Sequence, residues 1–210
     1  LRYYRFQARF GSTLDSEGED ACAELAPTLK GLSRERVAME VLGLLGLSDP
    51  LVTVQRMHER GVLPVILPEV SADGLERLGT LIVTERQQGA APDAIRRLAA
   101  MLPAEARTAE QVAARLRLSN AHKKRLARLA ARARRPGDPR VLAYREGIEM
   151  ARDLLLLADQ PTAPLNGWDI PQFPLRGGAI VARGVEAGPE VARVLQAVES
   201  RWLEEGVPNE

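Results

Sequence analysis

The 210-residue sequence is poor in several residue types on which binding and catalytic sites often depend. It contains a single cysteine, Cys22, which excludes an intramolecular disulfide and any metal cluster held by several thiolates. Aromatic residues make up only 4% of the chain, which is little for a surface that stacks bases. The formal net charge is +1, so the charge of the whole chain favours no particular class of partner.

Long hydrophobic runs are also missing. No run approaches the roughly 18 apolar residues of a membrane helix, and the longest dense patch covers only Leu154–Ala158. The amino terminus lacks the pattern of a secretory signal. With 45% hydrophobic and 27% charged residues, the composition is that of a globular protein. We therefore expect a cytoplasmic protein that does not bind a membrane.

Motifs of catalysis and metal binding are absent as well. His58 and His122 lie far apart, with no ligand spacing to partners. The sequence has no Asp-x-Asp pair, no Gly-x-Ser-x-Gly and no lysine-containing phosphate loop, since Arg176-Gly177-Gly178 is too short for one. We expect no catalytic residue, no metal ligand and no cofactor in this chain.

Capping residues and helical spacing recur almost throughout, and no segment alternates with the period of a strand. We predict helices from Asp15 to about Leu29, from Ser33, from Pro50 to before Gly61, over 71–88 and 92–102, from a capping box at Thr108 to Leu116, and from Ser119 to about Arg134. Residues Leu63–Pro68 read as a buried apolar linker. Steps of three and four from Val141 to Ala158 predict a further amphipathic helix.

Composition divides the chain further. Four prolines between 161 and 174 indicate a linker or an ordered irregular segment, and a glycine-rich stretch followed by a last helix closes the sequence. The sequence predicts an all-α protein, an irregular multi-helix array with a Pro/Gly-rich linker and a small helical tail. Its expected parts are residues 1–70, 71–160 with a basic helix over 119–135, 161–174, and 175–210.

Positive charge is concentrated in one window. From Arg115 to Arg140 there are ten Lys or Arg and one acid, a charge of +9, which leaves −8 for the rest. Lys124, Arg128, Arg132 and Arg135 step by four, four and three, so they share one face of the predicted helix. Such a stripe favours RNA or DNA phosphate. The alternative is a solvated face, or one neutralised by acidic helices elsewhere in the fold.

The first eleven residues predict a helix ended by Gly11. It carries Arg2, Arg5 and Arg9 beside an aromatic stripe of Tyr3, Phe6 and Phe10. The alternative is an ordinary helix with an aromatic core face and an arginine water face. Because no capping residue precedes it, we expect the chain to be part of a longer protein.

Several segments carry a resemblance to a known family. They are the arginine-aromatic helix 1–11, the segment Leu32–Glu40, with Glu35, Arg36 and Glu40 in a Glu-Arg-hydrophobic-x-x-Glu motif, the segment Met57–Glu69, and, near the other end, Phe173–Ala179 with Gly188-Pro189 and Trp202. In this order they resemble class II tRNA nucleotidyltransferases, the CCA-adding enzymes, and the related bacterial poly(A) polymerases. Ala179 departs from the aspartate usual in family tails.

The resemblance implies a neck (1–70), a body (71–160), a linker and a tail, without the catalytic head. The head would bind Mg²⁺ and use CTP or ATP, and would be a partner of this region in the full protein. The resemblance also implies that Glu35, Arg36 and Glu40 brace the nucleotide-reading helix, and that Arg2, Arg5 and Arg9 lie near the nucleotide and the acceptor end. RNA phosphates would meet the basic helix, at Lys123, Lys124, Arg125, Arg128, Arg132 and Arg135.

The expected function is therefore RNA binding, with tRNA as the expected RNA, by the carboxy-terminal region of an enzyme that adds CCA or poly(A) to RNA 3′ ends. The chain alone is expected to be inactive, because the family's chemistry lies in the head. The competing hypothesis is a helical protein-interaction module whose basic stripe binds an acidic partner. The sequence leaves CCA addition, poly(A) addition and the oligomeric state open.

Overall fold

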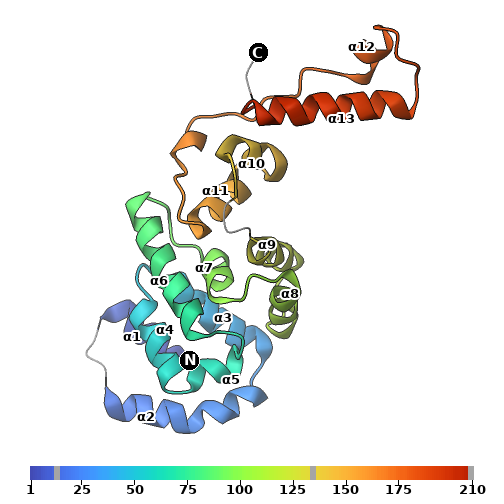
Figure 1. The fold of residues 1–210 in the computed structure, drawn as a ribbon. Helices are drawn as coiled ribbons and strands as arrows, with labels where there is room; N and C mark the ends of the chain where they lie inside the picture. Colours follow the sequence, from blue (N-terminus) through green and yellow to red (C-terminus); the bar gives the residue numbers. More distant parts are fainter. Residues whose placement is uncertain (12–14, 133–135, 208–210) are drawn as a thin grey trace. The chain divides into compact units, whose positions relative to one another are not determined.

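The computed structural model describes residues 1–11, 15–132 and 136–207, and all regular structure in these ranges is helical (Figure 1). The all-α class predicted from the sequence is confirmed. The chain divides into two compact units. The first comprises residues 1–134 and 156–160, and the second comprises residues 135–155 and 161–210.

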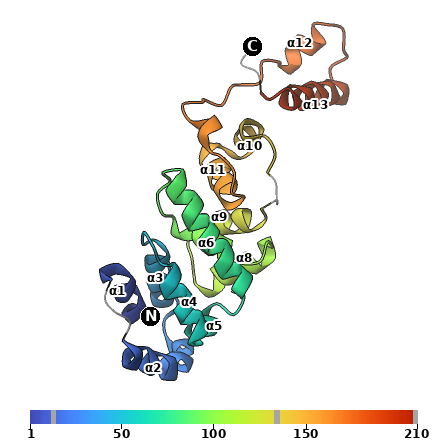
Figure 2. The same cartoon turned by 60° about the vertical axis from the view of Figure 1, so that its left-hand side comes forward.

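The first unit begins with a group of short helices. The helices are α1 (Arg2–Phe10), α2 (Ser16–Leu25), the 3₁₀ helix η1 (Ala26–Gly31), α3 (Arg34–Leu45), α4 (Leu51–Glu59) and α5 (Val62–Ile66). Helix α1 packs against α3 and α4, and α5 packs against η1 (Figure 2). Side-chain caps explain two of the starts, because Asp15 accepts from the amide of Glu17 and Ser33 accepts from that of Arg36.

The rest of the first unit is built on α6 (Ala72–Gln87), α7 (Ala94–Met101), α8 (Ala106–Arg115) and α9 (Asn120–Ala130). Helix α7 contacts α3, α6 and α9, so it is the central element of this group (Figure 1). All of its residues from Ile95 to Met101 are buried, including two arginines. At Gly74 in α6, an added Cβ would lie 2.3 Å from the carbonyl oxygen of Met101, so glycine permits the close approach of α6 to α7.

The second unit contains α10 (Pro139–Glu146), α11 (Ile148–Leu157), whose last two residues are counted with the first unit, η2 (Ala163–Leu165), α12 (Gly177–Val181) and α13 (Pro189–Glu204). It contains an aromatic cluster, in which the Trp202 ring lies 5.2 Å from that of Tyr144 and 5.5 Å from that of Phe173. The Tyr144 hydroxyl donates to Glu199 at 2.6 Å and ties α10 to α13.

Four local predictions from the sequence are wrong. The helix expected over 119–135 ends at Ala130, and Ala131 and Arg132 leave it. Thr108 does not cap a helix, because α8 already begins at Ala106 and the Thr108 hydroxyl bonds Glu105. The stretch 63–68 is not a linker, since most of it forms α5, although Leu63, Ile66 and Leu67 are buried as expected.

The fourth wrong prediction is a continuous amphipathic helix over 141–158. Gly147 separates α10 from α11 with φ 84° and ψ 155°, a conformation essentially restricted to glycine. The apolar steps of three and four continue across the break, so periodicity alone did not show it.

Candidate nucleic-acid interface

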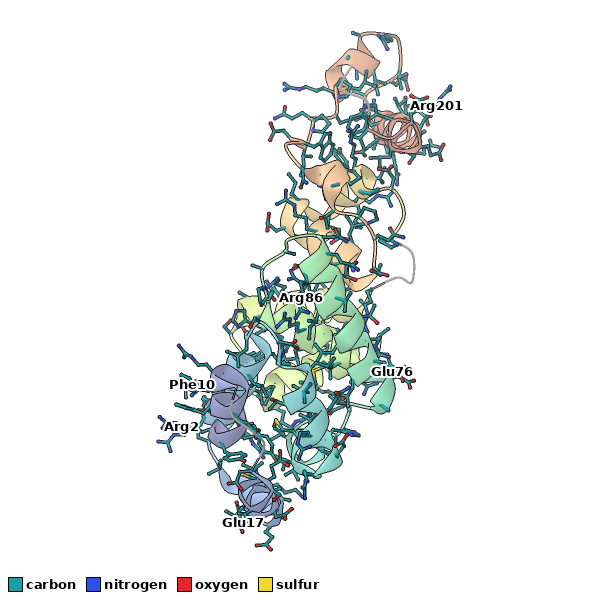
Figure 3. All side chains as sticks on the ribbon, turned by 90° about the vertical axis from the view of Figure 1, so that its left-hand side faces the viewer. Arg2, Phe10, Glu17, Glu76, Arg86 and Arg201 are labelled. Atoms are coloured by element: carbon teal, nitrogen blue, oxygen red, sulfur yellow. The ribbon has the colours of Figure 1, made fainter. Side chains whose placement is uncertain are left out.

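Helix α1 carries an exposed arginine-aromatic surface, formed by Arg2, Phe6, Arg9 and Phe10 and called the α1 surface below. Phe6 is 39% exposed and Phe10 is 68% exposed, whereas Tyr4 and Gln7 supply the buried face. The Arg2 guanidinium lies 5.1 Å from the Phe6 ring and that of Arg9 lies 5.6 Å from the Phe10 ring. Figure 3 shows Arg2 and Phe10 pointing outward from the helix. The phenylalanines are therefore not a core face, which was the alternative left open by the sequence.

Arg5 is the arginine of α1 that faces the fold. Its Nε donates to the Glu40 carboxylate at 2.6 Å, and the two side chains are 22% and 14% exposed. Gly43 makes room for it, because a Cβ there would lie 2.9 Å from Arg5 Cδ. The structure thus joins Arg5 of α1 to Glu40 of α3, rather than pairing Glu40 with Arg36 within the helix.

A cleft of about 410 Å³ lies where α1 meets α3. Arg2, Arg36 and Glu40 line it together with an apolar wall of Leu1, Leu32, Val37 and Met39. Met39 is 64% exposed and Leu32 is 46% exposed. The structure therefore brings three of the sequence-predicted residues into one cleft with two cations, one anion and an apolar side. We call it the α1–α3 cleft.

Glu35 lies apart from this cleft. Its carboxylate accepts from Arg117 at 2.7 Å and from the Ser33 hydroxyl at 2.8 Å. The hydrogen bond from Arg117 is the main cause that lowers the pKa of Glu35 to about 2. Both side chains are more than half exposed, so this pair adds little to stability.

The other side of α1 rests on a buried carboxylate. Glu19 of α2 is fully buried and accepts from Arg56 Nε at 2.7 Å, with Arg60 3.5 Å away. The hydrogen bond from Arg56 lowers the pKa of Glu19, although burial acts in the opposite direction. Two half-buried arginines of α4 and its carboxyl end thus compensate a carboxylate that would otherwise be costly to bury.

The second group of predicted residues lies on α9. Ser119 caps this helix by accepting from the amide of His122, and Leu126, Leu129 and Ala130 form its buried face. Lys124 is exposed and Lys123 is partly exposed. Arg125 instead pairs with Asp93 at 2.9 Å. Burial opposes the ionisation of Asp93, but the bonds from the Arg96 amide and from Arg125 outweigh it and lower its pKa.

The expected solvent-facing stripe on this helix is only partly correct. Arg132 was expected to face solvent, but it is half-buried, and its Nη1 and Nη2 donate to the carbonyls of Ala99 and Leu102 at 2.9 and 3.1 Å. Arg128 is half-buried and has interactions of its own. Arg135 lies outside the described residues. Because the chain leaves the helical path at Ala131, helical spacing no longer places Arg132 beside Arg128.

Acidic side chains from elsewhere in the fold neutralise part of the basic window, as the sequence alternative allowed. Arg115 makes a two-pronged pair with Glu69 at 2.8 and 2.6 Å, Arg117 pairs with Glu35, and Arg125 pairs with Asp93. The exposed positive charge of α9 is therefore centred on Lys123 and Lys124 rather than spread over the whole window.

Sequence reasoning missed a buried charge cluster between α6 and α7. Glu85, Arg96 and Arg97 are at most 7% exposed, and both arginines bond the one carboxylate at 2.6 to 2.8 Å. Arg97 also donates to the carbonyl of Leu45, which ends α3. This cluster joins three helices through residues that lie up to 52 positions apart in the sequence. The spacing of neighbouring residues cannot predict such long-range pairs.

The described residues contain no group of three or more His, Cys, Asp or Glu side chains placed to hold a metal ion. The Mg²⁺ that the resemblance implies for the head thus has no ligand set in this part of the chain, and we derive no step through it. In the same ranges, no helix is both long and apolar enough to cross a membrane.

Comparisons with known proteins bear on this arrangement. Residues 11–73 match the family model described as the probable RNA- and SrmB-binding site of polymerase A. The chain is 26% identical over 229 residues to the mouse mitochondrial CCA tRNA nucleotidyltransferase 1, covering 98% of this chain and 51% of that protein. It spans about half the length of the curated relative that it matches.

Solved structures show the same fold. The Thermotoga maritima CCA-adding enzyme complexed with tRNA matches 92% of this chain and 53% of its own, with 16% identity and a TM-score of 0.60. A CCA-adding enzyme in complex with CTP matches 93% of this chain and 53% of its own, with 16% identity and a TM-score of 0.62.

The family-model match and the likeness in fold relate this chain to the helical regions of RNA nucleotidyltransferases. Within that class, the sequence motifs and the mouse relative indicate the family of CCA-adding enzymes and bacterial poly(A) polymerases. The family resemblance stated from the sequence is thereby confirmed.

Proposed function

We propose that this chain is the RNA-binding region of an enzyme that adds nucleotides to RNA 3′ ends without a template, with tRNA as its RNA. The α1 surface is the observation that carries the proposal. Exposed arginines stacked on exposed phenylalanines combine phosphate attraction with flat faces on which unpaired bases stack.

The α1–α3 cleft supports a role near the RNA 3′ end. Arg2 and Arg36 supply positive charge, and Met39 and Leu32 supply an apolar wall beside it. Arg5 is held by Glu40 and fitted over Gly43, so it positions α1 against α3. In the family that the chain resembles, the nucleotide-reading helix comes just before this point. We propose that the Arg5–Glu40 pair fixes the direction in which that helix enters.

Lys123 and Lys124 on α9 would hold the RNA backbone farther from the 3′ end. The choice between CCA and poly(A) addition is not carried by these contacts, which would meet phosphates rather than base edges. We propose CCA addition, because the relatives listed above are CCA-adding enzymes.

The test is the salt dependence of tRNA binding. Fluorescence anisotropy with a labelled tRNA transcript should show affinity falling with salt, with a log–log slope of about −3 if Lys123, Lys124 and Arg128 meet phosphates. The double reversal Lys123→Glu with Lys124→Glu should flatten the slope by about 2.

The matched control is Lys30→Glu with Arg107→Glu, which makes the same charge change at two exposed residues of the same unit. We expect this control to change the slope by less than about 1. If the control and the α9 variant weaken binding equally, the phosphate contact at α9 is contradicted. If the wild-type chain does not bind tRNA, the proposed function is wrong.

The second candidate function is a protein-interaction module, and the description of the matched family model includes SrmB binding. The basic residues of α9 lie outside the matched residues 11–73. If the chain is such a module, they would bind an acidic protein surface, and an excess of tRNA would not displace the protein partner.

A further inference from the structure

A second cleft, of about 430 Å³, lies in the first unit beside the carboxyl end of α7. Its lining consists of two arginines, Arg77 and Arg132, one carboxylate, Asp159, and the apolar or small residues Pro103, Ala104, Leu157 and Ala158. None of these residues belongs to the α1 surface, to the α1–α3 cleft or to the exposed lysines of α9. We call it the α7 cleft.

Both arginines are anchored by backbone carbonyls. Arg77 donates from Nε to Ala100 at 2.8 Å and from Nη2 to Leu102 at 3.2 Å. Arg132 donates from its two terminal nitrogens to Ala99 and to Leu102. The carbonyl oxygen of Leu102 therefore accepts from both guanidiniums, which places two like charges close together.

The partners of these arginines differ from those of their neighbours. In the part of the chain that the structure describes, neither Arg77 nor Arg132 has a carboxylate within salt-bridge distance, whereas Arg115, Arg117 and Arg125 each have one. Asp159 lines the same cleft, but it accepts a hydrogen bond from the Thr84 hydroxyl. With two guanidiniums and one carboxylate, the cleft keeps a positive charge.

The electrostatic surroundings of Arg132 agree with this imbalance. Burial lowers the pKa of Arg132 to about 10, and the charge of Arg77 acts in the same direction. A second positive charge at short range in a half-buried site is poorly screened by water. An anion bound between the two guanidiniums would offset both effects.

We propose that the α7 cleft binds a phosphate group of the RNA backbone, with Arg77 and Arg132 as its two ligands. This proposal rests on the RNA-binding function proposed above. A guanidinium carries five N–H donors, and the bonds to carbonyls within the described residues do not use Nη1 of Arg77 or Nε of Arg132. Fixed planar donors of this kind suit phosphate oxygens.

The competing explanation is that the two arginines only cap α7. Cations near the carboxyl end of a helix are favourable, because the last carbonyls carry partial negative charge. A cap would explain the carbonyl bonds, and it would not require that a bound RNA cover either side chain.

Arginine footprinting of the wild-type chain separates the two explanations. The chain is treated with phenylglyoxal, and modification at Arg77, Arg132 and the exposed Arg107 is read by mass spectrometry, with and without a tRNA transcript. Binding of the tRNA is measured by anisotropy in the same solution. We expect tRNA to reduce modification of Arg77 and Arg132 several-fold and to leave Arg107 within about twofold.

Each outcome decides something. If tRNA is bound while Arg77 and Arg132 react as before, the α7 cleft is not a phosphate site, and the proposed RNA-binding function still stands. If no tRNA binds, both fail. A parallel arm with inorganic phosphate at matched ionic strength distinguishes the source. If tRNA protects Arg77 and Arg132 from modification, the proposal is supported, whether or not free phosphate also protects them. If free phosphate protects them and tRNA does not, the proposal is contradicted.

Substitutions give an independent measurement. Arg77→Gln and Arg132→Gln should each weaken tRNA binding about tenfold and flatten the salt slope by about 1. Arg132→Lys, which keeps the charge, should keep most of the slope.

Arg107→Gln is the control for loss of a cation from the same unit. Equal affinity of wild type and a folded Arg132→Gln variant would overturn the proposal, and the footprint decides if that variant does not fold.

Discussion

At the scale of single residues, the arginines are the informative side chains of this molecule. Twenty-six of the 29 basic residues are arginine, and most of those described above are bound by a carboxylate or a carbonyl. From composition alone, one learns only that the chain uses arginine rather than lysine for most of its positive charges. The structure shows three distinct uses, which are ion pairs between helices, bonds to helix-terminal carbonyls, and the exposed arginines of the α1 surface.

The sequence could name the charged residues of the neck but not their partners. Glu40 and Arg36 are four residues apart with the cation first, which is the weaker order for a pair within one helix and leaves room for tertiary contacts. The actual partner of Glu40 is Arg5, 35 positions away. A tertiary pair is set by which helices pack together, and one sequence carries no direct record of that.

Glu19 gives a stability prediction at this scale. Glu19→Gln should lower the free energy of unfolding by about 1.5–3 kcal/mol at neutral pH, because the buried bonds from Arg56 lose their charged acceptor. Glu24→Gln, at an exposed site of the same helix, should change it by less than about 0.5 kcal/mol. Urea unfolding of the three proteins measures both values.

The same variant makes a prediction about pH. The folded pKa of Glu19 is below its ordinary value of 4.5. Its contribution is therefore complete above about pH 4.5 and is lost as pH falls toward the lower folded pKa. Glu19→Gln should show a weaker loss of stability in acid than the wild type. An acid dependence identical to that of the wild type would show that Glu19 is not ionised in the fold.

At the scale of elements, the sequence located most helices but misjudged several of their ends. Asp15, Ser33 and Ser119 cap helices as predicted, because a cap is a local bond between a side chain and an amide two or three residues on. Thr108 failed as a cap because α8 begins before it. The carboxyl end of α9 was missed because the carbonyls at the end of α7 bind Arg132 in a position outside that helix.

The break at Gly147 leads to a prediction about α10 and α11. Nothing lies within 4 Å of a Cβ built on Gly147, so alanine has space there and the backbone conformation is the obstacle. Gly147→Ala should destabilise the second unit by about 1–3 kcal/mol. Thermal unfolding followed by circular dichroism is the measurement.

Gly178 supplies the control for that substitution. It lies inside α12 without a positive φ and also has open space around a Cβ. Gly178→Ala should therefore stabilise the chain by up to about 1 kcal/mol. If Gly147→Ala behaves in the same way, α10 and α11 can join into the continuous helix that the apolar spacing predicted.

At the scale of the whole molecule, positive and negative charges are separated along the sequence but paired in the fold. The +9 window and the −8 remainder look like two opposed regions in the sequence. In the fold, Glu69, Glu35 and Asp93 each meet an arginine of the window. The net field is therefore smaller than the window suggests. A count of charges along the sequence overestimates the positive charge of an interface whenever acidic residues from other parts of the fold pair with its basic residues.

The carboxylates of the chain lead to the last prediction, which concerns activity. Nucleotide addition with Mg²⁺ requires acidic ligands gathered around the metal. Here Glu19, Glu40 and Glu85 lie on three separate helices, and each is bound by an arginine. The sequence also lacks the Asp-x-Asp pair that the resemblance assigns to the head.

We therefore expect this 210-residue chain to bind tRNA without extending it. The chain would be purified from cells depleted of their own nucleotidyltransferase and incubated with tRNA lacking its terminal CCA, Mg²⁺, CTP and ATP, and the RNA would be separated on a sequencing gel. Retained tRNA binding in the same preparation shows that the chain is folded. Extension that co-purifies with the chain would mean that its dispersed carboxylates can gather around a metal, and that the assignment of the chemistry to the head is wrong.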